Sequence, residues 1–196
     1  MKLYVLAPSG NSYKVLILLS LLRVPFEKVL LDGKQKEHKQ PAFLALSPRG
    51  EVPVIEDGNI VIWDSSACLV YLARKHGGEQ WLPTAPGPMA EVMQWLALAG
   101  NELQFGLQYA RRGLVMGRWT AGTLEEGQAL GRIALGALDQ RLGKHDWLAT
   151  GRPTIADVAC FPYTETAPEA KVPLEPYPAV NAWLARCKAL PGWPAR

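Results

Sequence analysis

Residues 47–76 read SPRGEVPVIEDGNIVIWDSSACLVYLARKH, which is the pattern of a turn, a β-hairpin and a helix in succession. The dipeptide Asp57-Gly58 stands between two runs of β-branched residues, and such a dipeptide is a strong signal for a tight hairpin turn. We therefore expect strands over 53–56 and 60–62. A helix follows over 65–76, and two consecutive glycines end it.

The residues before this segment alternate strands with helices. Short apolar runs over 2–6 and 26–31 predict strands, and helices are expected over 12–22 and 38–46. With the hairpin and its following helix, the predicted order is βαβαββα. Alternation of strands and helices favours parallel pairing and the hairpin adds an antiparallel pair, so we expect a mixed sheet flanked by helices.

The composition changes after residue 78. Three prolines and a glycine fall within residues 79–88, which is typical of a linker. Beyond it only helices are expected, over 89–112, over 124–142, from residue 154 onward and over 177–190. We therefore predict two domains, 1–78 and 89–196, joined by the linker.

Charge, hydropathy and cysteine content exclude several classes of protein. The formal net charge of +3 is scattered, with no basic stripe of the kind that binds nucleic acid. The apolar run Val15–Leu22 is far shorter than the roughly 20 residues that span a bilayer. Three widely spaced cysteines without a CxxC pair argue against a disulfide framework, a zinc site and a dithiol motif. We expect a cytoplasmic protein that binds no nucleic acid, membrane or metal.

Three short motifs, in a fixed order along the chain, carry a resemblance to a known family. They are SPRGEVPVI at 47–55, IWDSS at 62–66 and TIAD at 154–157. In the last, Thr154 and Asp157 have the spacing of a capping box, which closes the first turn of a helix. Together the motifs resemble the cytosolic glutathione transferase superfamily, serine type, over nearly the whole chain.

This resemblance implies a thioredoxin-like N-terminal domain, an all-helical C-terminal domain and glutathione as co-substrate. It also implies a homodimer whose contacts come mostly from residues 64–112. The implied activity is conjugation of the glutathione thiolate to hydrophobic electrophiles. Glutathione-dependent reduction of peroxides or disulfides is an alternative, and so is a non-catalytic binding protein of the same fold.

The resemblance also assigns residues to the glutathione site. Val52, before a cis Pro53, is expected to pair its backbone with the cysteinyl unit, as a β-strand would. Ser65 is expected to hold the γ-glutamyl carboxylate, and Asp64 to face the γ-glutamyl ammonium group. The chemistry is apt, because a helix N-terminus offers unpaired N–H donors and favours anions. Capping alone would explain the same two residues.

The glycyl carboxylate of glutathione is assigned by resemblance to His38 and Lys39. Charge-assisted hydrogen bonds suit a carboxylate. A solvated charge run is the alternative interpretation of the same residues. Glu51 departs from the family pattern, in which many members have Gln or Lys at this position. An ionised carboxylate here would repel the glycyl carboxylate of glutathione. Either Arg49 offsets this charge or Glu51 points to solvent.

The residue that binds the glutathione sulfur is sought in the turn before the first helix. By resemblance Ser9 is the first choice, since its hydroxyl can donate to the sulfur and stabilise the thiolate. Asn11 stands at an offset used by one bacterial branch of the family. Ser12, which is expected to be the N-cap of the helix, is a third candidate.

The second substrate is expected to bind to the helical domain. Phe105, Tyr109 and Arg112 fall on one helical face, and the resemblance places the electrophile pocket there, with Met116 and Trp119 as further candidates. Ordinary helix packing would give the same pattern. The sequence does not name the electrophile.

Overall fold

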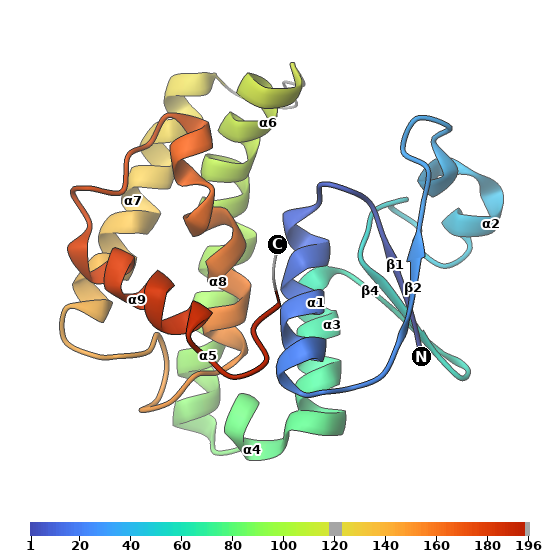
Figure 1. Ribbon diagram of the computed structural model, residues 1–196, viewed down its shortest axis with the longest axis horizontal. Coiled ribbons are helices and arrows are strands. Elements are labelled where there is room, and N and C mark those ends of the chain that lie inside the picture. Colours follow the sequence, from blue (N-terminus) through green and yellow to red (C-terminus); the bar gives the residue numbers. More distant parts are fainter. Residues whose placement is uncertain (118–122, 195–196) are drawn as a thin grey trace. The chain divides into compact units, whose positions relative to one another are not determined.

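The computed structural model describes residues 1–117 and 123–194 (Figure 1). These residues form two compact units, of which the first is Met1–Gly78 together with the segment that begins at Pro191, and the second is Glu79–Leu190. That residues 1–78 and 89–196 form two separate domains stays a prediction. The final segment was expected in the helical half, but it groups with the first unit.

Two hydroxyl groups on the first helix hold this final segment. The Ser20 hydroxyl donates to the Gly192 carbonyl at 2.6 Å, and the Tyr13 hydroxyl donates to the Pro194 carbonyl at 3.3 Å. Such contacts join residues far apart in the chain, which is why the sequence pattern missed them.

The first unit has the predicted order βαβαββα. Its elements are β1 (Lys2–Val5), α1 (Gly10–Leu21), β2 (Glu27–Leu30), the 3-10 turn η1 (Glu37–Lys39), α2 (Pro41–Leu44), β3 (Val54–Asp57), β4 (Ile60–Trp63), α3 (Ser65–Leu72) and the π-helical turn η2 (Ala73–Gly77). The strands lie in the order β2-β1-β3-β4, with β1 parallel to β2 and antiparallel to β3, and β3 antiparallel to β4. The predicted mixed sheet is confirmed.

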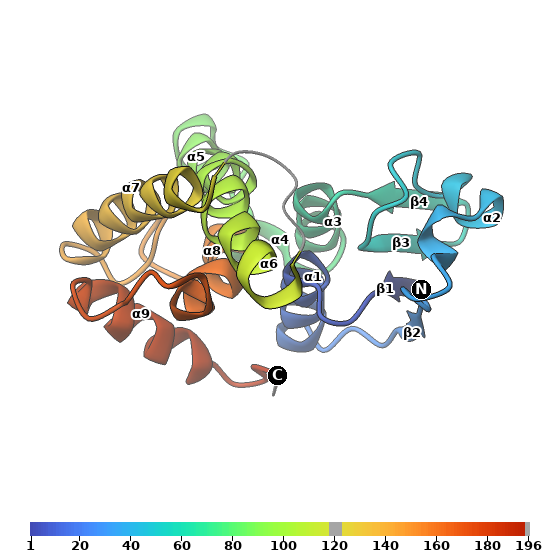
Figure 2. The same ribbon diagram turned by 90° about the horizontal axis from the view of Figure 1, so that it is seen from above.

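Helices cover both faces of this sheet. Figure 1 and Figure 2 show α1 and α3 on one face and α2 on the opposite side. Neighbouring strand residues such as Val54 and Ile55 are therefore both fully buried, although their side chains point to opposite faces. The core of the unit is completed by Leu3, Val15, Leu18, Leu69 and Leu72.

Two predicted helices of this unit differ in the structure. The helix expected over 12–22 begins at Gly10, so its first turn includes the polar residues before Ser12. The helix expected over 38–46 is split into η1 and α2, because Pro41 has no N–H for a continuing helix and instead starts a new one.

The strand register gathers three connections at one end of the sheet. Tyr4 of β1 lies opposite Val54 of β3, and Val54 lies opposite Trp63 of β4. Because β3 is antiparallel to both neighbours, the loop after β1, the segment before β3 and the start of α3 all leave the sheet at the same end.

The second unit is all-helical, as predicted. Its elements are α4 (Gly78–Trp81), α5 (Pro86–Gly100), the π-helical segment η3 (Glu102–Gln108), α6 (Tyr109–Met116), α7 (Leu124–Leu142), α8 (Ile155–Glu165), the 3-10 turn η4 (Ala167–Ala170) and α9 (Pro178–Lys188). The core is built from Val92, Leu103, Leu135, Leu138, Phe161 and Trp183.

The structure adds detail at the predicted linker, which stays a prediction, and it corrects one predicted helix. The linker expected over 79–88 is mostly helical, because α4 fills its start and Pro86 and Pro88 lie in the first turn of α5, where proline is tolerated. The single helix expected over 89–112 is three segments. Asn101, with φ −108° and ψ −91°, leaves the helical region and separates α5 from η3. The backbone stays helical from η3 into α6, where the helix type changes from π to α.

Helices η3 and α7 approach each other closely at glycines. A Cβ atom on Gly106 would lie 2.6 Å from the Gly131 nitrogen and 3.0 Å from the Gly127 carbonyl oxygen. Both are backbone atoms, which cannot move aside as a flexible side chain can. Glycine at 106 is therefore required by the packing of two helix backbones.

We expect Gly106→Ala to lower the free energy of unfolding by about 2–3 kcal/mol, because the methyl group overpacks this contact. Gly136→Ala is the matched control, since a Cβ there meets nothing within 4 Å. That change should stabilise helix α7 by about 0.5–1 kcal/mol. Urea unfolding followed by tryptophan fluorescence measures both, and equal stabilities for the two variants would contradict the close-packing account.

In the described part of the chain, no helix is both long and apolar enough to cross a membrane. The three cysteines are buried and form no disulfide with one another. Burial raises the pKa of the Cys68 thiol to about 12, so this thiol stays protonated and unreactive at neutral pH.

Candidate functional site

Ser9 caps helix α1. It has the extended backbone expected of an N-cap (φ −113°, ψ 116°), and its Oγ accepts a hydrogen bond from the Ser12 N–H at 3.1 Å. The expectation that Ser12 is the cap was wrong, because the helix begins before it. As an acceptor Ser9 uses only a lone pair, so its O–H can still donate to another group.

Ser12 instead lies inside the first turn of α1. Its side chain is only 2 % exposed, and its Oγ has no hydrogen-bond partner among the described residues. A buried, inward-lying hydroxyl is a poorer ligand for an incoming sulfur than the half-buried Ser9 at the helix end.

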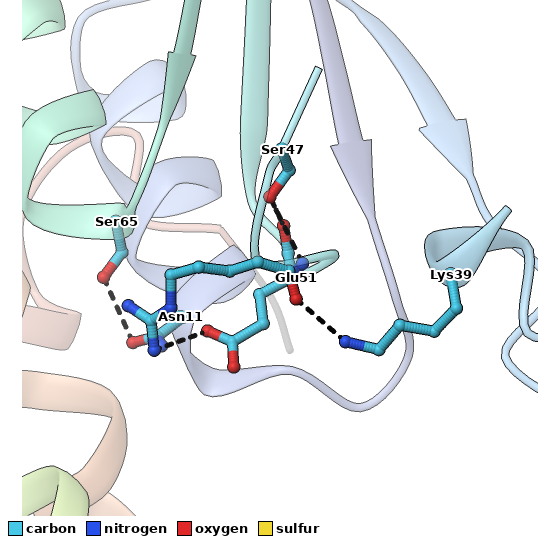
Figure 3. A network of polar contacts seen from close by, with 6 residues as sticks. Asn11, Lys39, Ser47, Glu51 and Ser65 are labelled. Atoms are coloured by element: carbon cyan, nitrogen blue, oxygen red, sulfur yellow. Dashed lines mark hydrogen bonds and ion pairs between the residues drawn. The ribbon is translucent and has the colours of Figure 1, made fainter. Parts of the chain in front are cut away.

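Asn11 connects the N-termini of α1 and α3. The Ser65 hydroxyl donates to the Asn11 Oδ1 at 3.1 Å, as Figure 3 shows. Ser65 is only 4 % exposed. The two residues are 54 positions apart in sequence, and their contact fixes the spacing of two helix ends whose N–H groups favour anions.

Asp64 is the N-cap of α3, as predicted. A single carboxylate oxygen, Oδ1, accepts from the Ser66 N–H at 2.8 Å and from the Ala67 N–H at 3.2 Å. Its other oxygen is not used in these cap bonds. Capping therefore leaves half of the carboxylate to attract a cation.

The Val52–Pro53 peptide bond is cis, as the sequence suggested. The loop before it is closed by Ser47, whose hydroxyl donates to the Glu51 carbonyl at 3.0 Å and accepts from the Glu51 N–H at 3.2 Å (Figure 3). Gly50 in this loop has φ 58°, and a Cβ there would lie 2.6 Å from the His38 carbonyl oxygen. The loop that leads to the cis bond is thus tightly held against η1.

Charged residues lie along the same loop. The Lys39 ammonium donates to the Arg49 carbonyl at 2.9 Å, and an Arg49 guanidinium nitrogen lies 3.0 Å from a Glu51 carboxylate oxygen. The Arg49 and Glu51 side chains are 53 % and 56 % exposed. Both earlier explanations for Glu51 therefore hold, since Arg49 offsets its charge and the side chain reaches solvent. No pattern in the sequence predicted the contacts of Lys39 and Arg49.

The tyrosines near the turn have other partners. The Tyr4 hydroxyl donates to a Glu56 carboxylate oxygen at 3.1 Å, and burial together with this carboxylate raises the pKa of Tyr4. Tyr13 donates to the Pro194 carbonyl. These contacts leave Ser9 and Asn11 as the polar side chains at the helix end.

The predicted electrophile residues form a cluster in the second unit. The Phe105 and Tyr109 rings meet edge to face with centroids 5.0 Å apart, and the Arg112 guanidinium carbon lies 5.8 Å from the Tyr109 ring centroid. The common helical face expected from their spacing is confirmed. Phe105 is 45 % exposed. Trp119 lies outside the described residues.

Asp157 is the centre of a buried hydrogen-bond network. The predicted capping box with Thr154 is confirmed, with the Thr154 N–H donating to Oδ2 at 2.9 Å. Oδ1 also accepts from the Leu148 N–H at 3.1 Å and from the Trp183 indole N–H at 3.0 Å. Sequence reasoning missed these two donors, and it missed a second, exposed capping box at Thr123 and Glu126, whose Thr-x-x-Glu spacing was visible.

Within residues 1–117 and 123–194, no cluster of three or more His, Cys, Asp or Glu side chains is arranged to hold a metal ion. The polar groups gathered at the sheet end are instead hydroxyls, amides, a carboxylate and helix N–H groups. Such a set suits a zwitterionic, peptide-like ligand.

Comparison with known proteins gives two family matches. The family described as "Glutathione S-transferase, N-terminal domain" matches residues 8–75, and "Glutathione S-transferase, C-terminal domain" matches residues 123–191. The first match contains the turn, the cis-proline loop and the start of α3.

Individual relatives cover almost the whole chain. Glutathione S-transferase D7 of Anopheles gambiae is 28 % identical over 95 % of this chain and 85 % of its own length. The disulfide-bond oxidoreductase YfcG of Escherichia coli is 26 % identical over 94 % of this chain and 89 % of its own length. A crystal structure from Rhodopseudomonas palustris is described as a possible glutathione S-transferase. It is 36 % identical with a TM-score of 0.91, and the match covers 99 % of this chain and 96 % of that one.

Proposed function

The chain belongs to the glutathione S-transferase family, and from that membership we propose that it conjugates glutathione to apolar electrophilic small molecules. In this reaction glutathione loses its thiol proton to solvent, and the thiolate attacks the electrophilic carbon. With a chloronitroaromatic substrate a C–S bond forms, the C–Cl bond breaks, and chloride leaves with the bonding electron pair.

The observation that carries this proposal is the meeting of three segments at one end of the sheet. The strand register brings the Ser9 turn, the Val52–Pro53 cis bond and the Asp64–Ser65 helix start together. A peptide-like thiol bound along Val52 would have its γ-glutamyl end at the N-terminus of α3 and its sulfur near Ser9. Family membership supplies glutathione as that thiol.

Ser9 is assigned to stabilise the thiolate. Its Oγ already accepts the Ser12 N–H, which orients the hydroxyl so that its proton can point out of the helix end. A hydrogen bond donated to the sulfur lowers the thiol pKa and so raises the fraction of the nucleophilic thiolate. Asn11 is assigned a supporting role, because its Oδ1 is occupied by Ser65.

The two ends of glutathione are assigned to charged groups. At the γ-glutamyl end Asp64 attracts the ammonium group. The Ser65 N–H binds the carboxylate, and the Ser65 hydroxyl joins it by turning its proton from the Asn11 Oδ1 to the ligand. At the glycyl end Lys39 and His38 attract the carboxylate. The ion pair between Arg49 and Glu51 reduces the repulsion that Glu51 alone would cause.

A homodimer in the cytoplasm is part of the same proposal. Strand β4 lies at the edge of the sheet, and its residues Ile60, Val61 and Trp63 are 46 %, 39 % and 41 % exposed. Exposed apolar surface of this kind marks interaction sites. We assign it to the contact with a second copy of this chain, next to residues 64–112, which the resemblance implies form most of that contact. A reducing cytoplasm suits three buried cysteines that form no disulfide with one another.

Glutathione-dependent disulfide reduction is the second candidate. Asn11 in the turn before α1 and the similarity to a disulfide-bond oxidoreductase favour keeping it. In that reaction the glutathione thiolate would attack a disulfide sulfur, and the displaced thiolate would leave with the electron pair.

Calorimetric titration with glutathione, followed by activity assays on the same sample, tests the proposal. The panel contains a chloronitroaromatic, an organic hydroperoxide and a mixed disulfide. We expect binding and conjugation of the first. Activity only on the other two would support the reductase, and no binding at millimolar glutathione would refute the site.

We expect Ser65→Ala to weaken glutathione binding about tenfold or more, because a hydrogen bond to a charged carboxylate is lost. Ser66→Ala is the matched control, since Ser66 is the next residue of the same helix turn and contributes its backbone N–H to the cap in either case. Equal affinities in the two variants would show that the Ser65 hydroxyl is not a ligand.

A further inference from the structure

The pair Arg111-Arg112 is divided between two roles. The Arg111 side chain is only 12 % exposed and forms an ion pair with Glu169, with an N–O distance of 2.7 Å. Arg112 has no carboxylate within ion-pair distance among the described residues. Its guanidinium carbon lies instead over the Tyr109 ring, at 5.8 Å from the centroid. One arginine therefore holds helix α6 to η4, and the other keeps an unneutralised charge.

A guanidinium group beside an aromatic ring keeps its N–H donors available to other partners. The attraction to the ring uses the plane of the group, whereas its N–H donors lie in that plane and point outward. Those donors match a carboxylate in a two-bond arrangement. Arg112 thus lies beside Tyr109 and retains the capacity to bind an anion.

An aromatic surface adjoins this charge. Phe105, one turn away on the same face, meets Tyr109 edge to face and is 45 % exposed. It lies in the π-helical segment η3, and such segments are frequent at functional sites. A planar ring placed against Phe105 and Tyr109 would remove apolar surface from water. The cluster therefore presents an aromatic surface with a cation at one end.

We infer that the electrophile is an aromatic acid, whose carboxylate binds the Arg112 guanidinium while its ring lies against Phe105 and Tyr109. This inference rests on the proposed transferase function for the reaction itself. It adds a charge requirement to the apolar electrophile that the family resemblance implied.

The test compares 4-chloro-3-nitrobenzoate with its neutral amide, 4-chloro-3-nitrobenzamide. In both, the glutathione sulfur replaces chlorine at the ring carbon, chloride leaves with the electron pair, and the acid or amide group is unchanged. Rates are expressed relative to the uncatalysed reaction, because the two groups activate the ring differently. We expect the benzoate to be preferred.

Arg112→Gln should lower kcat/KM for the benzoate by about 10- to 100-fold and leave the amide little changed, because only the acid loses a charge-assisted contact. Arg112→Lys keeps the charge but lacks the planar arrangement of N–H donors. Its kcat/KM for the benzoate should lie between those of wild type and Arg112→Gln. Arg132→Gln, an exposed site on α7, makes the same change in net charge and should affect neither substrate. Equal losses on both substrates for Arg112→Gln, or no loss, would overturn the inference.

A binding measurement separates this inference from the transferase proposal. Calorimetry with 4-methyl-3-nitrobenzoate, which has no leaving group, should show Arg112-dependent binding that the corresponding amide lacks. If conjugation is absent but this binding is present, the acid site stands and the transferase function fails. If wild-type protein binds acid and amide alike, the acid site fails whatever the conjugation assays show.

Discussion

Replacing Ser9 with alanine is expected to lower kcat/KM for conjugation about 100-fold, the usual effect of removing one donor to a developing or full anion. The same change should raise the pKa of the bound glutathione thiol, because the thiolate loses its hydrogen bond. The pH profile of conjugation and the thiolate absorbance of the complex measure the two effects independently.

The difficulty with Ser9→Ala is that Ser9 also caps α1, and losing a cap costs about 1 kcal/mol of stability. Ser9→Asp separates the two roles, since aspartate is as good an N-cap as serine. An ionised carboxylate cannot donate to sulfur, however, and it repels a thiolate. We expect Ser9→Asp to be as stable as wild type and less active than Ser9→Ala.

Asn11 provides the competing explanation. If Asn11→Ala abolishes conjugation while Ser9→Ala and Ser9→Asp retain it, the sulfur ligand is Asn11. If all three variants keep the wild-type rate, the turn before α1 takes no part in the chemistry. Glutathione affinity measured on each variant shows whether any loss lies in binding or in the reaction.

Asp157→Ala is expected to lower the free energy of unfolding by about 3–5 kcal/mol, because several buried donors lose their acceptor together. The donors are the N–H groups of Leu148 and Thr154 and the indole N–H of Trp183. Asp157 is only 2 % exposed, so water cannot replace the carboxylate. Chemical unfolding followed by tryptophan fluorescence measures the loss.

Glu126→Ala is the matched control for this prediction. Glu126 occupies the same place in the capping box of α7, but that box is exposed and water can satisfy the N–H groups. We expect only a small change in stability. Losses of the same size at the two positions would show that the cap alone matters and that the buried Asp157 network adds nothing.

The same residue gives stability a pH dependence. Burial raises the pKa of the Asp157 carboxyl from 3.8 to about 6, against the opposing effect of its hydrogen bonds. The folded state therefore holds this proton in a range where the unfolded chain has released it. The resulting stabilisation is complete below about pH 4 and is lost as the pH rises through 6. The stability of wild type relative to Asp157→Asn should fall across this range.

The order of elements and several local motifs could be predicted from the sequence alone. The hairpin at Asp57-Gly58, the cap at Asp64, the cis bond before Pro53 and the capping box at Thr154 all depend on residues that are neighbours in the chain. Backbone preferences and short-range hydrogen bonds decide such features, so the pattern of residue types is sufficient. The family, and through it glutathione, followed from these motifs.

Tertiary structure decided which polar groups meet. The contact between Ser65 and Asn11 spans 54 positions, and that between Trp183 and Asp157 spans 26. The close approach of Gly106 to Gly131 likewise depends on how two helices pack. Either Ser9 or Ser12 would be a good N-cap by residue type. Only the observed start of α1 at Gly10 showed that the cap is Ser9. Such contacts depend on the relative placement of whole elements, which burial of the core sets and no local pattern encodes.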